Sequence, residues 1–307
     1  MIDLYEFNKR FDKVVIWGHK LHSHTHSYVM NGFYRTLKHI GINVYWFDDN
    51  DKINDVDFNR TLFITEGQVD KKIPITKNSF YVLHNCCDPK YKVLLESKNA
   101  MVLQVYTDDV LKYNLFKVDN CIYEDVSGKC LYQPWATDLL PDEIDANKIS
   151  QQKEDVVWWV GTIGGGEFGN INEINPFKKA CEENGIEFRL AQNKSAEESV
   201  ALIKKSYLAP AIVGTWQHRQ GYVPCRIFKN ISYGKMGITN SPRVHELFDK
   251  KIIHNNDTYK LYYDAEKYIK DMSQDELYSL MDLVKEKHTY INRINEILYF
   301  ISKIKGN

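Results

Sequence analysis

The stretch that decides the fold is KVVIWG, residues 13–18, in which four consecutive apolar side chains end at a glycine. A helical pattern follows at about Tyr28–Ile40, with Gly41 placed to stop it, and a second apolar run follows at Asn43–Phe47. Near-continuous apolar strands that alternate with helices are typical of a parallel sheet covered on both faces. The start of the chain therefore predicts a strand–helix–strand unit of an α/β fold.

The same alternation recurs in two halves, which a polar, acidic stretch separates. Further strands are expected at Thr61–Thr65, Ser79–His84, Met101–Tyr106, Val156–Val160, Ile186–Leu190 and Leu208–Val213, and helices at Pro176–Asn184 and Ser195–Lys205. Ser195 and Glu198 form a capping-box pattern at the start of the last of these helices. We predict two Rossmann-like α/β domains, residues 1–135 and 155–272, with a linker at 136–154. A long C-terminal helix at 273–307 is expected to pack back on the domains.

Composition excludes several classes of protein. The 307 residues include 43% hydrophobic ones, which suffices for a sizeable core, and the formal net charge of −1 offers no general attraction to a polyanion. No apolar run approaches the roughly 20 residues of a membrane span, and the N-terminus is too charged for a signal peptide. The six cysteines form no CxxC pair. We therefore expect a cytoplasmic protein with no membrane span and no nucleic acid partner.

Acidic residues are absent from one long window, residues 199–245. The same window contains the basic residues Lys204, Lys205, Arg219, Arg226, Lys229, Lys235 and Arg243. A local excess of positive charge is typical of a site for an anion such as a diphosphate. The alternative is a solvated basic surface that is paired with acidic residues from elsewhere in the chain.

Within this window, the loop at residues 221–226 leads into a helix, with Pro224 near the first turn. Free backbone N–H groups at such a helix start favour phosphate oxygens, and Arg226 can add a bidentate contact. Asn240 and Ser241 form a polar turn after the next expected strand. Trp216 can stack on a nucleobase with Arg219 near a phosphate, although a Trp that simply packs in the core fits the pattern equally well.

The segment Val223–Ser241 resembles the donor-binding segment of GT-B glycosyltransferases. It is closest in outline to the exostosin-like form, in which an Arg opens a helix and a Gly ends it; here these are Arg226 and Gly234. That form usually has a Glu three residues after the Arg, where this chain has Lys229. The resemblance implies a GT-B fold with an acceptor-side first domain and a second domain that binds a nucleotide-diphosphate sugar.

The activity implied by this resemblance is transfer of a hexose or pentose to a hydroxyl of a glycan, glycoconjugate or other acceptor, without a metal and without a cofactor. The candidate donor-binding residues are Gly161, Gly164, Trp216, Arg219, Tyr222, Val223, Pro224, Arg226, Lys229, Asn240 and Ser241. Arg226, Lys229 and Arg219 would neutralise the leaving diphosphate.

A second phosphate-binding pattern is GGGEFG at residues 164–169, which satisfies GxGxxG and has Glu187 about 20 residues onward. In a dinucleotide site the loop should turn directly into a helix, whereas the helix here is expected only from Pro176. We therefore interpret residues 161–169 as a rim that lets backbone approach the donor or acceptor. A nicotinamide-dependent oxidoreductase and a non-catalytic binder of a phosphorylated small molecule remain as alternatives.

Four histidines follow the first strand, at positions 19, 22, 24 and 26. A metal site is one interpretation, although no carboxylate or cysteine accompanies them in the loop. A polar loop that caps a helix is another. We favour a general base for an acceptor hydroxyl, because an imidazole pKa near 6.5 suits that role. His24 is the first choice, His22 and His26 are acceptor-side alternates, and Glu66, after a later strand, is the carboxylate candidate.

Overall fold

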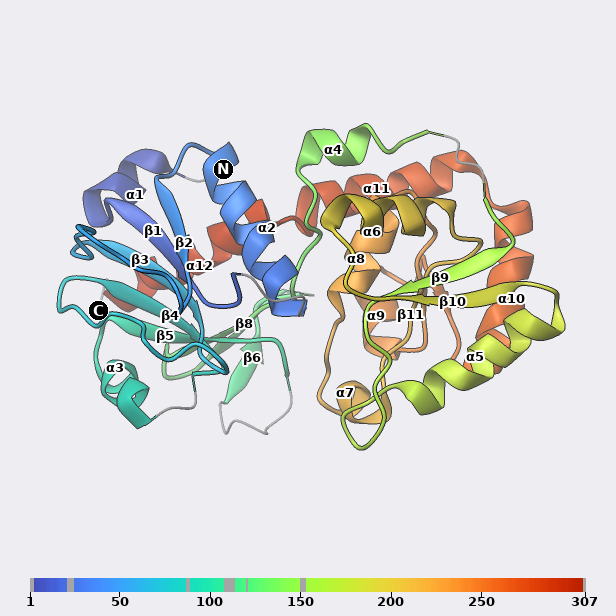
Figure 1. The fold of residues 1–307 in the computed structure, drawn as a ribbon, viewed down its shortest axis with the longest axis horizontal. Helices are drawn as coiled ribbons and strands as arrows, with labels where there is room; N and C mark the ends of the chain where they lie inside the picture. Colours follow the sequence, from blue (N-terminus) through green and yellow to red (C-terminus); the bar gives the residue numbers. More distant parts are fainter. Residues whose placement is uncertain are drawn as a thin grey trace. The chain divides into compact units, whose positions relative to one another are not determined.

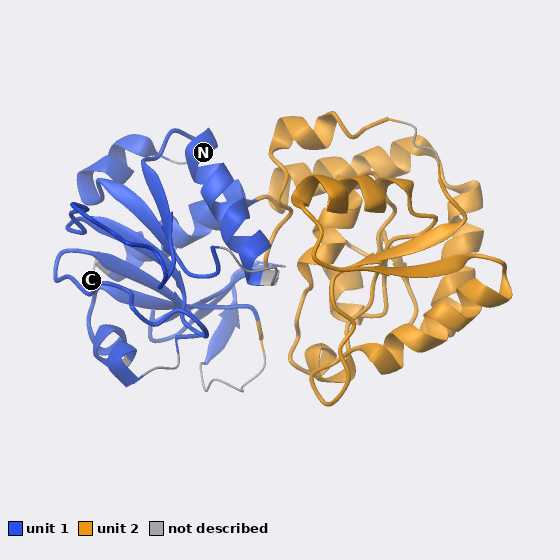
Figure 2. Ribbon diagram, viewed as in Figure 1, with its two compact units in different colours: residues 1–105, 111–133, 290–307 blue, residues 106–110, 134–289 orange. Residues whose placement is uncertain are grey.

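The computed structural model describes residues 3–20, 25–86, 89–107, 114–119, 121–149 and 153–305. The chain forms two compact units, coloured separately in Figure 2. Unit 1 comprises residues 1–105, 111–133 and 290–307, and unit 2 comprises residues 106–110 and 134–289. The boundary predicted at 135/136 lies close to the observed change of unit at 133/134, whereas the one predicted at 154/155 lies inside unit 2, because residues 136–154, predicted to be a linker, belong to that unit.

Unit 1 contains an eight-stranded sheet in the order β2-β1-β3-β4-β5-β8-β7-β6 (Figure 1). Its strands are β1 (Lys13–Trp17), β2 (Val44–Phe47), β3 (Thr61–Glu66), β4 (Phe80–His84), β5 (Ala100–Gln104), β6 (Leu115–Lys117), β7 (Tyr123–Asp125) and β8 (Cys130–Tyr132). Neighbours from β2 to β8 in this order pair in parallel, whereas β7 and β6 add an antiparallel ribbon. The central strands β3, β4 and β5 are buried along their whole length, which explains their continuous apolar sequences.

The helices of unit 1 include one from the far end of the chain. They are α1 (Leu4–Arg10), α2 (Thr25–His39), the short η1 (Pro89–Tyr91), α3 (Lys92–Glu96) and α12 (Tyr290–Lys305). Tyr290 at the start of α12 is buried, and its ring lies 4.6 Å from that of Phe33 on α2. A side chain at Gly32 would overlap the Tyr290 ring, so glycine is required at this approach of the two helices.

Unit 2 contains parallel strands in two small sheets, β10-β9 and β11-β12-β13. The strands are β9 (Val156–Val160), β10 (Glu187–Ala191), β11 (Pro210–Ala211), β12 (Ile238–Thr239) and β13 (Ile253–His254). The helices are α4 (Pro141–Asp145), α5 (Ile171–Glu183), α6 (Ala196–Lys205), α7 (Thr215–Arg219), α8 (Cys225–Ser232), α9 (Pro242–Leu247), α10 (Thr258–Asp271) and α11 (Gln274–Lys287). The alternation of strands and helices predicted for this half is confirmed.

The structure refines three of the expected elements. Helix α5 begins at Ile171, five residues before the predicted start, so that Pro176 lies inside the helix. The capping box of α6 is present, because Ser195 Oγ accepts the Glu198 N–H and Glu198 accepts the Ser195 N–H. The C-terminal helical region is divided into α11 in unit 2 and α12 in unit 1. Among the described residues, no helix is both long and apolar enough to cross a membrane.

Candidate functional site

The ends of three neighbouring strands of unit 1 bring polar side chains together. Glu66 is the last residue of β3 and His84 the last of β4, and the two are register partners in the parallel sheet. His19 follows β1 on the other side of β3, and His26 lies in the first turn of α2. In a parallel α/β sheet the carboxyl ends of the strands meet at one edge, where ligand sites are found. We call these four residues the histidine–glutamate cluster.

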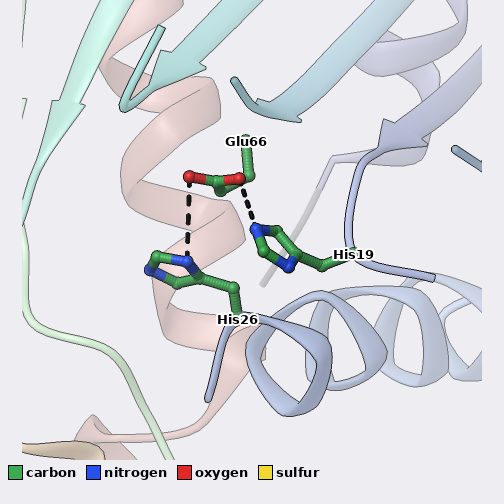
Figure 3. Close-up of side chains that lie close together, drawn as sticks. All are labelled: His19, His26 and Glu66. Carbon is green, nitrogen blue, oxygen red and sulfur yellow. Dashed lines mark ion pairs between the residues drawn. The ribbon is translucent and has the colours of Figure 1, made fainter. Parts of the chain in front are cut away.

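Figure 3 shows two imidazoles directed at the Glu66 carboxylate. His19 Nε2 lies 2.5 Å from Glu66 Oε2, and His26 Nδ1 lies 3.7 Å from Glu66 Oε1. The rings of His19 and His26 are 5.2 Å apart, and those of His26 and His84 are 5.3 Å apart. The side chains of Glu66 and His19 are 0% and 3% exposed, whereas that of His26 is 13% exposed. His26 therefore links the cluster to solvent.

Burial and neighbouring charge act in opposite directions on Glu66. Burial raises the pKa of its carboxyl, but the hydrogen bond with His19 and the charges of His26, His19 and His84 outweigh burial and lower the pKa overall. For His84, burial is the largest influence and lowers the pKa, against the opposing effect of the Leu103 carbonyl oxygen 2.9 Å from Nδ1. The lowered pKa favours the ionised form of Glu66, and a buried carboxylate of this kind can hold a cation.

The backbone that carries His19 is held in an unusual conformation. His19 has φ 51°, and Gly18 before it has φ 121°. A side chain at Gly18 would come within 2.8 Å of the Glu66 carbonyl oxygen. The His19 N–H donates to Asp70 Oδ2 at 2.9 Å, which stabilises the strained turn. Strain that surrounding contacts hold in place is frequent at functional sites, and here it directs the His19 ring at Glu66.

Two members of this cluster, Glu66 and His26, were predicted from the sequence as candidates for the acceptor side, and the structure brings them together. His22 and His24 lie outside the described residues, so the roles of His24 as base and His22 as acceptor-side residue stay predictions. His84 was not selected, because nothing local marks a histidine at a strand end as functional. Only its position marks it: the strand expected at Thr61–Thr65 ends next to Glu66, and the next expected strand, Ser79–His84, ends at His84.

In unit 2, Arg226 lies in the first turn of α8, where its guanidinium covers the Trp159 ring at 4.0 Å from the ring centre. Gly161 lies beside it, since a Cβ on that glycine would come within 2.9 Å of Arg226 Nη2. Burial lowers the pKa of Arg226 to about 10. Among the described residues, Arg226 forms no ion pair with an acidic group. A half-buried cation of this kind is suited to binding an anion.

Three other basic residues between positions 199 and 245 already have partners. Two of them pair with acidic residues from outside this window, and the third donates to a backbone carbonyl oxygen. Lys229 Nζ lies 3.4 Å from Asp138 Oδ2, and Asp138 also accepts a hydrogen bond of 2.6 Å from Tyr233. Lys205 Nζ lies 2.9 Å from Glu154 Oε1. Lys235 is buried and donates to the Ser206 carbonyl oxygen at 2.6 Å. The window is therefore partly a paired basic surface, and Lys229 is directed at a carboxylate.

Asn240 and Ser241 have structural roles in this conformation. The Asn240 side chain accepts from the Val213 N–H and donates to the Val213 carbonyl oxygen, each at 2.9 Å. Ser241 caps helix α9, and its hydroxyl accepts the Val244 N–H. Pro224 is the N-cap of α8, and Val223 is buried.

Aromatic residues lie together on one part of unit 2. Trp216 packs edge-on against Phe168 at 4.9 Å and against Tyr106 at 5.4 Å, and Tyr222 lies 5.6 Å from Tyr106. Phe168 is 64% exposed, so this group reaches the surface and can stack on a planar ligand. Arg219 is exposed at the end of α7.

The glycine-rich loop closes on itself. The Gly164 carbonyl oxygen accepts the N–H groups of Asn170 and Ile171, and the Gly164 N–H donates to the Asn170 side chain. A side chain at Gly169 would overlap the Gly164 backbone, and one at Gly214 would overlap Gly169. These glycines therefore permit close backbone packing within the loop, which accounts for the pattern without a dinucleotide.

Comparison with solved structures identifies the fold. The chain is similar to an alpha-glucosyltransferase in complex with UDP, at a TM-score of 0.62 and 9% identity over 94% of this chain and 99% of that chain. It is also similar to an alpha-glucosyltransferase in complex with UDP and a 13-mer DNA containing an HMU base, at a TM-score of 0.55 and 10% identity, with the same coverage. No protein-family model matches the chain, and no curated protein matches its sequence. The predicted fold, two Rossmann-like units of the GT-B type, is confirmed.

The prediction that excluded nucleic acid is wrong, because a protein of this fold was solved with a 13-mer DNA. That prediction rested on the net charge of −1, which is an average over the whole surface. Binding to nucleic acid depends on local basic groups and on contacts to bases, which an overall balance of charge does not exclude. The glycan or glycoconjugate acceptor that the sequence suggested stays a prediction.

Proposed function

We propose that this chain is a glycosyltransferase that uses a UDP-sugar as donor. The GT-B fold supports the proposal, as do two solved structures of the same fold that hold UDP. Neither a nicotinamide cofactor nor binding without catalysis is favoured by these comparisons. The proposal assigns the donor to unit 2 and the loss of the acceptor's proton to unit 1.

The observation that carries the donor assignment is the environment of Arg226. Its guanidinium is partly buried at the start of α8, between the Trp159 ring and the Gly161 backbone, without an acidic partner among the described residues. A diphosphate would supply the missing negative charge, and the guanidinium would stabilise that charge as the sugar–phosphate bond breaks. We propose that this guanidinium supplies the positive charge that the diphosphate requires, so that no metal is needed there.

Several finer assignments belong to the proposal. The exostosin-like form of the donor segment stays a prediction. Where that form has a Glu that binds the ribose, this chain has Lys229, which pairs with Asp138. The exposed aromatic group around Trp216 is proposed to stack on the uracil base. Whether a hexose or a pentose is transferred stays a prediction.

On the acceptor side, we propose that a hydroxyl group loses its proton at the histidine–glutamate cluster. The ionised, buried Glu66 stabilises positive charge that develops on the imidazoles, and the partly exposed His26 is the member that an acceptor reaches. The acceptor class we propose to test first is DNA with a hydroxymethylated base, because a neighbour of the same fold was solved with DNA containing an HMU base.

The first experiment measures UDP binding by calorimetry. Arg226→Ala should lower the affinity about 10- to 100-fold, which corresponds to the roughly 1.5–3 kcal/mol of a hydrogen bond to a charged group. The affinity of Arg226→Lys for UDP should lie between those of the wild type and Arg226→Ala, because lysine keeps the charge but loses the bidentate geometry. The matched control is Arg189→Ala, which removes an exposed arginine of unit 2 that pairs with Glu187. Equal affinity in Arg226→Ala and Arg189→Ala would refute the donor assignment.

The second experiment measures catalysis. Wild-type protein is incubated with UDP-glucose and a duplex that contains an HMU base, and a duplex with thymine in its place is the control. A mass increase of one hexose on the first duplex alone is the expected result. Release of UDP without a change in either duplex would retain the donor assignment and reject this acceptor. Binding of UDP without any turnover would identify a non-catalytic binder.

A further inference from the structure

We propose that His19, His26 and Glu66 form a binding site for one divalent transition-metal ion of the zinc class. The inference concerns the side chains of unit 1 and is independent of donor binding in unit 2. It rests on the proposed function only in its last step, where the ion takes part in activating the acceptor.

The three candidate ligand groups already lie close together. One imidazole nitrogen from each histidine and one carboxylate oxygen all lie within 4.8 Å of one another. Zinc bonds of about 2.0–2.2 Å place tetrahedral ligand atoms roughly 3.4 Å apart. His26 Nδ1 lies 3.7 Å from Glu66 Oε1, which is close to that value, whereas His19 Nε2 lies 2.5 Å from the other oxygen, Oε2, so the two histidines contact different oxygens of the carboxylate. Movements of about 1 Å would place all three atoms around a common ion.

Different elements of unit 1 hold the three groups in place. Glu66 is held at the end of the buried strand β3, and its Oε1 accepts the Gln68 N–H at 3.2 Å. His19 is held by the strained turn after β1 and by Asp70, whereas His26 belongs to helix α2. His84 packs edge-on against the His26 ring at 5.3 Å. Ligands that their surroundings orient in this way lose little freedom when an ion binds.

The chemistry of the three ligand groups selects the ion. Two imidazoles and one carboxylate are the ligand set of many catalytic zinc sites, in which a fourth position stays open for water or substrate. Magnesium and calcium prefer oxygen ligands and are disfavoured here. The carboxylate offsets part of the charge of a divalent ion in a buried site, and the exposure of His26 leaves a path from solvent to the open position.

A hydroxyl bound at the open position would lose its proton more readily, because a bound cation lowers the pKa of a coordinated water or hydroxyl. With the ion bound, His19 and His26 would coordinate it, and the ion would replace the imidazoles in activating the acceptor: the acceptor O–H bond breaks and its proton passes to water. The oxygen then forms a bond to the anomeric carbon of the sugar, as the bond from that carbon to the diphosphate breaks. UDP leaves with the electron pair of the broken bond.

The test uses Co²⁺ as the probe, because its visible absorption reports four-coordinate geometry. Full-length protein is treated with a chelator, dialysed and titrated with Co²⁺, and Zn²⁺ is then added in competition. We expect one bound ion per chain and displacement of the cobalt bands by Zn²⁺. Glu66→Gln and His26→Ala should each weaken binding by at least about 100-fold, since even outer partners of metal ligands contribute 10- to 100-fold.

The matched control is His39→Ala, which removes an exposed histidine from the other end of α2. It should bind Co²⁺ like the wild type. Circular dichroism verifies that each variant is folded, and His26→Ala decides the question if Glu66→Gln does not fold. Absence of stoichiometric binding, or equal binding in His26→Ala and His39→Ala, would show that the cluster is an ion pair only. UDP binding of the chelated protein tests the donor assignment separately, so the two proposals can fail independently.

Discussion

A single methyl group at Gly161 is predicted to displace the arginine proposed to bind the donor. In Gly161→Ala the new Cβ would lie 2.9 Å from Arg226 Nη2, closer than side-chain atoms ordinarily approach. The guanidinium is the far end of a flexible side chain, so it moves more readily than the backbone. The variant therefore keeps the charge of Arg226 and changes its position relative to Trp159.

Two costs follow from the geometry. Alanine at φ 121° is strained, at about 1–3 kcal/mol of unfolding free energy. Loss of a well-placed, charge-assisted contact to phosphate costs about 1.5–3 kcal/mol of binding free energy, or roughly 10- to 100-fold in the dissociation constant for UDP. Calorimetry with UDP measures the second cost, and thermal unfolding measures the first.

The control for this prediction comes from the same loop. A Cβ at Gly165 would have no neighbour within 4 Å, and its φ lies outside the strained positive range. Gly165→Ala should therefore bind UDP like the wild type and remain as stable. If Gly161→Ala is folded and also keeps the wild-type affinity for UDP, Arg226 does not hold the diphosphate from its present position.

Two further predictions concern stability. Burial lowers the pKa of Lys235 to about 7, so the folded protein binds this proton less tightly than the unfolded chain, whose lysine pKa is near 10.5. The contribution of Lys235 to stability should therefore be lost as the pH falls from about 10.5 to 7, and Lys235→Met should raise the melting temperature at pH 7 but not at pH 10. Tyr290→Ala removes a buried ring from the contact between α12 and α2 and should cost roughly 3–5 kcal/mol of unfolding free energy. A loss below about 1 kcal/mol in urea unfolding would contradict that packing.

The strands were predictable because burial leaves a direct mark on the sequence. The run at Lys13–Trp17 and the strand at Val156–Val160 match their predicted bounds, since both are short, apolar and rich in β-branched residues. Helix α5 was placed too late, because proline is usually read as the first turn of a helix. Here Pro176 is tolerated further along, and only the three-dimensional structure reveals that the helix has already begun.

The candidate sites show a similar division. Glu66 and Arg226 could be selected as candidates because each stands at a strand end or a helix start, positions that a sequence reveals. Contacts across the fold were not predictable: the partner of Lys229 is Asp138, and the aromatic ring beneath Arg226 is Trp159. Both pairings join residues that are separated by more than 60 positions, and no local pattern relates them.

The return of α12 to unit 1 affects the order in which the chain can fold during synthesis. The buried face around Gly32 and Phe33 is covered by Tyr290, and the Gln133 side chain donates to the Arg293 carbonyl oxygen at 3.3 Å. A ribosome releases both of these α12 residues only after the whole of unit 2. Domains usually fold in the order in which they are synthesised. Here the unit that begins first is completed last, and its apolar face remains exposed to chaperones or to aggregation until unit 2 has been made.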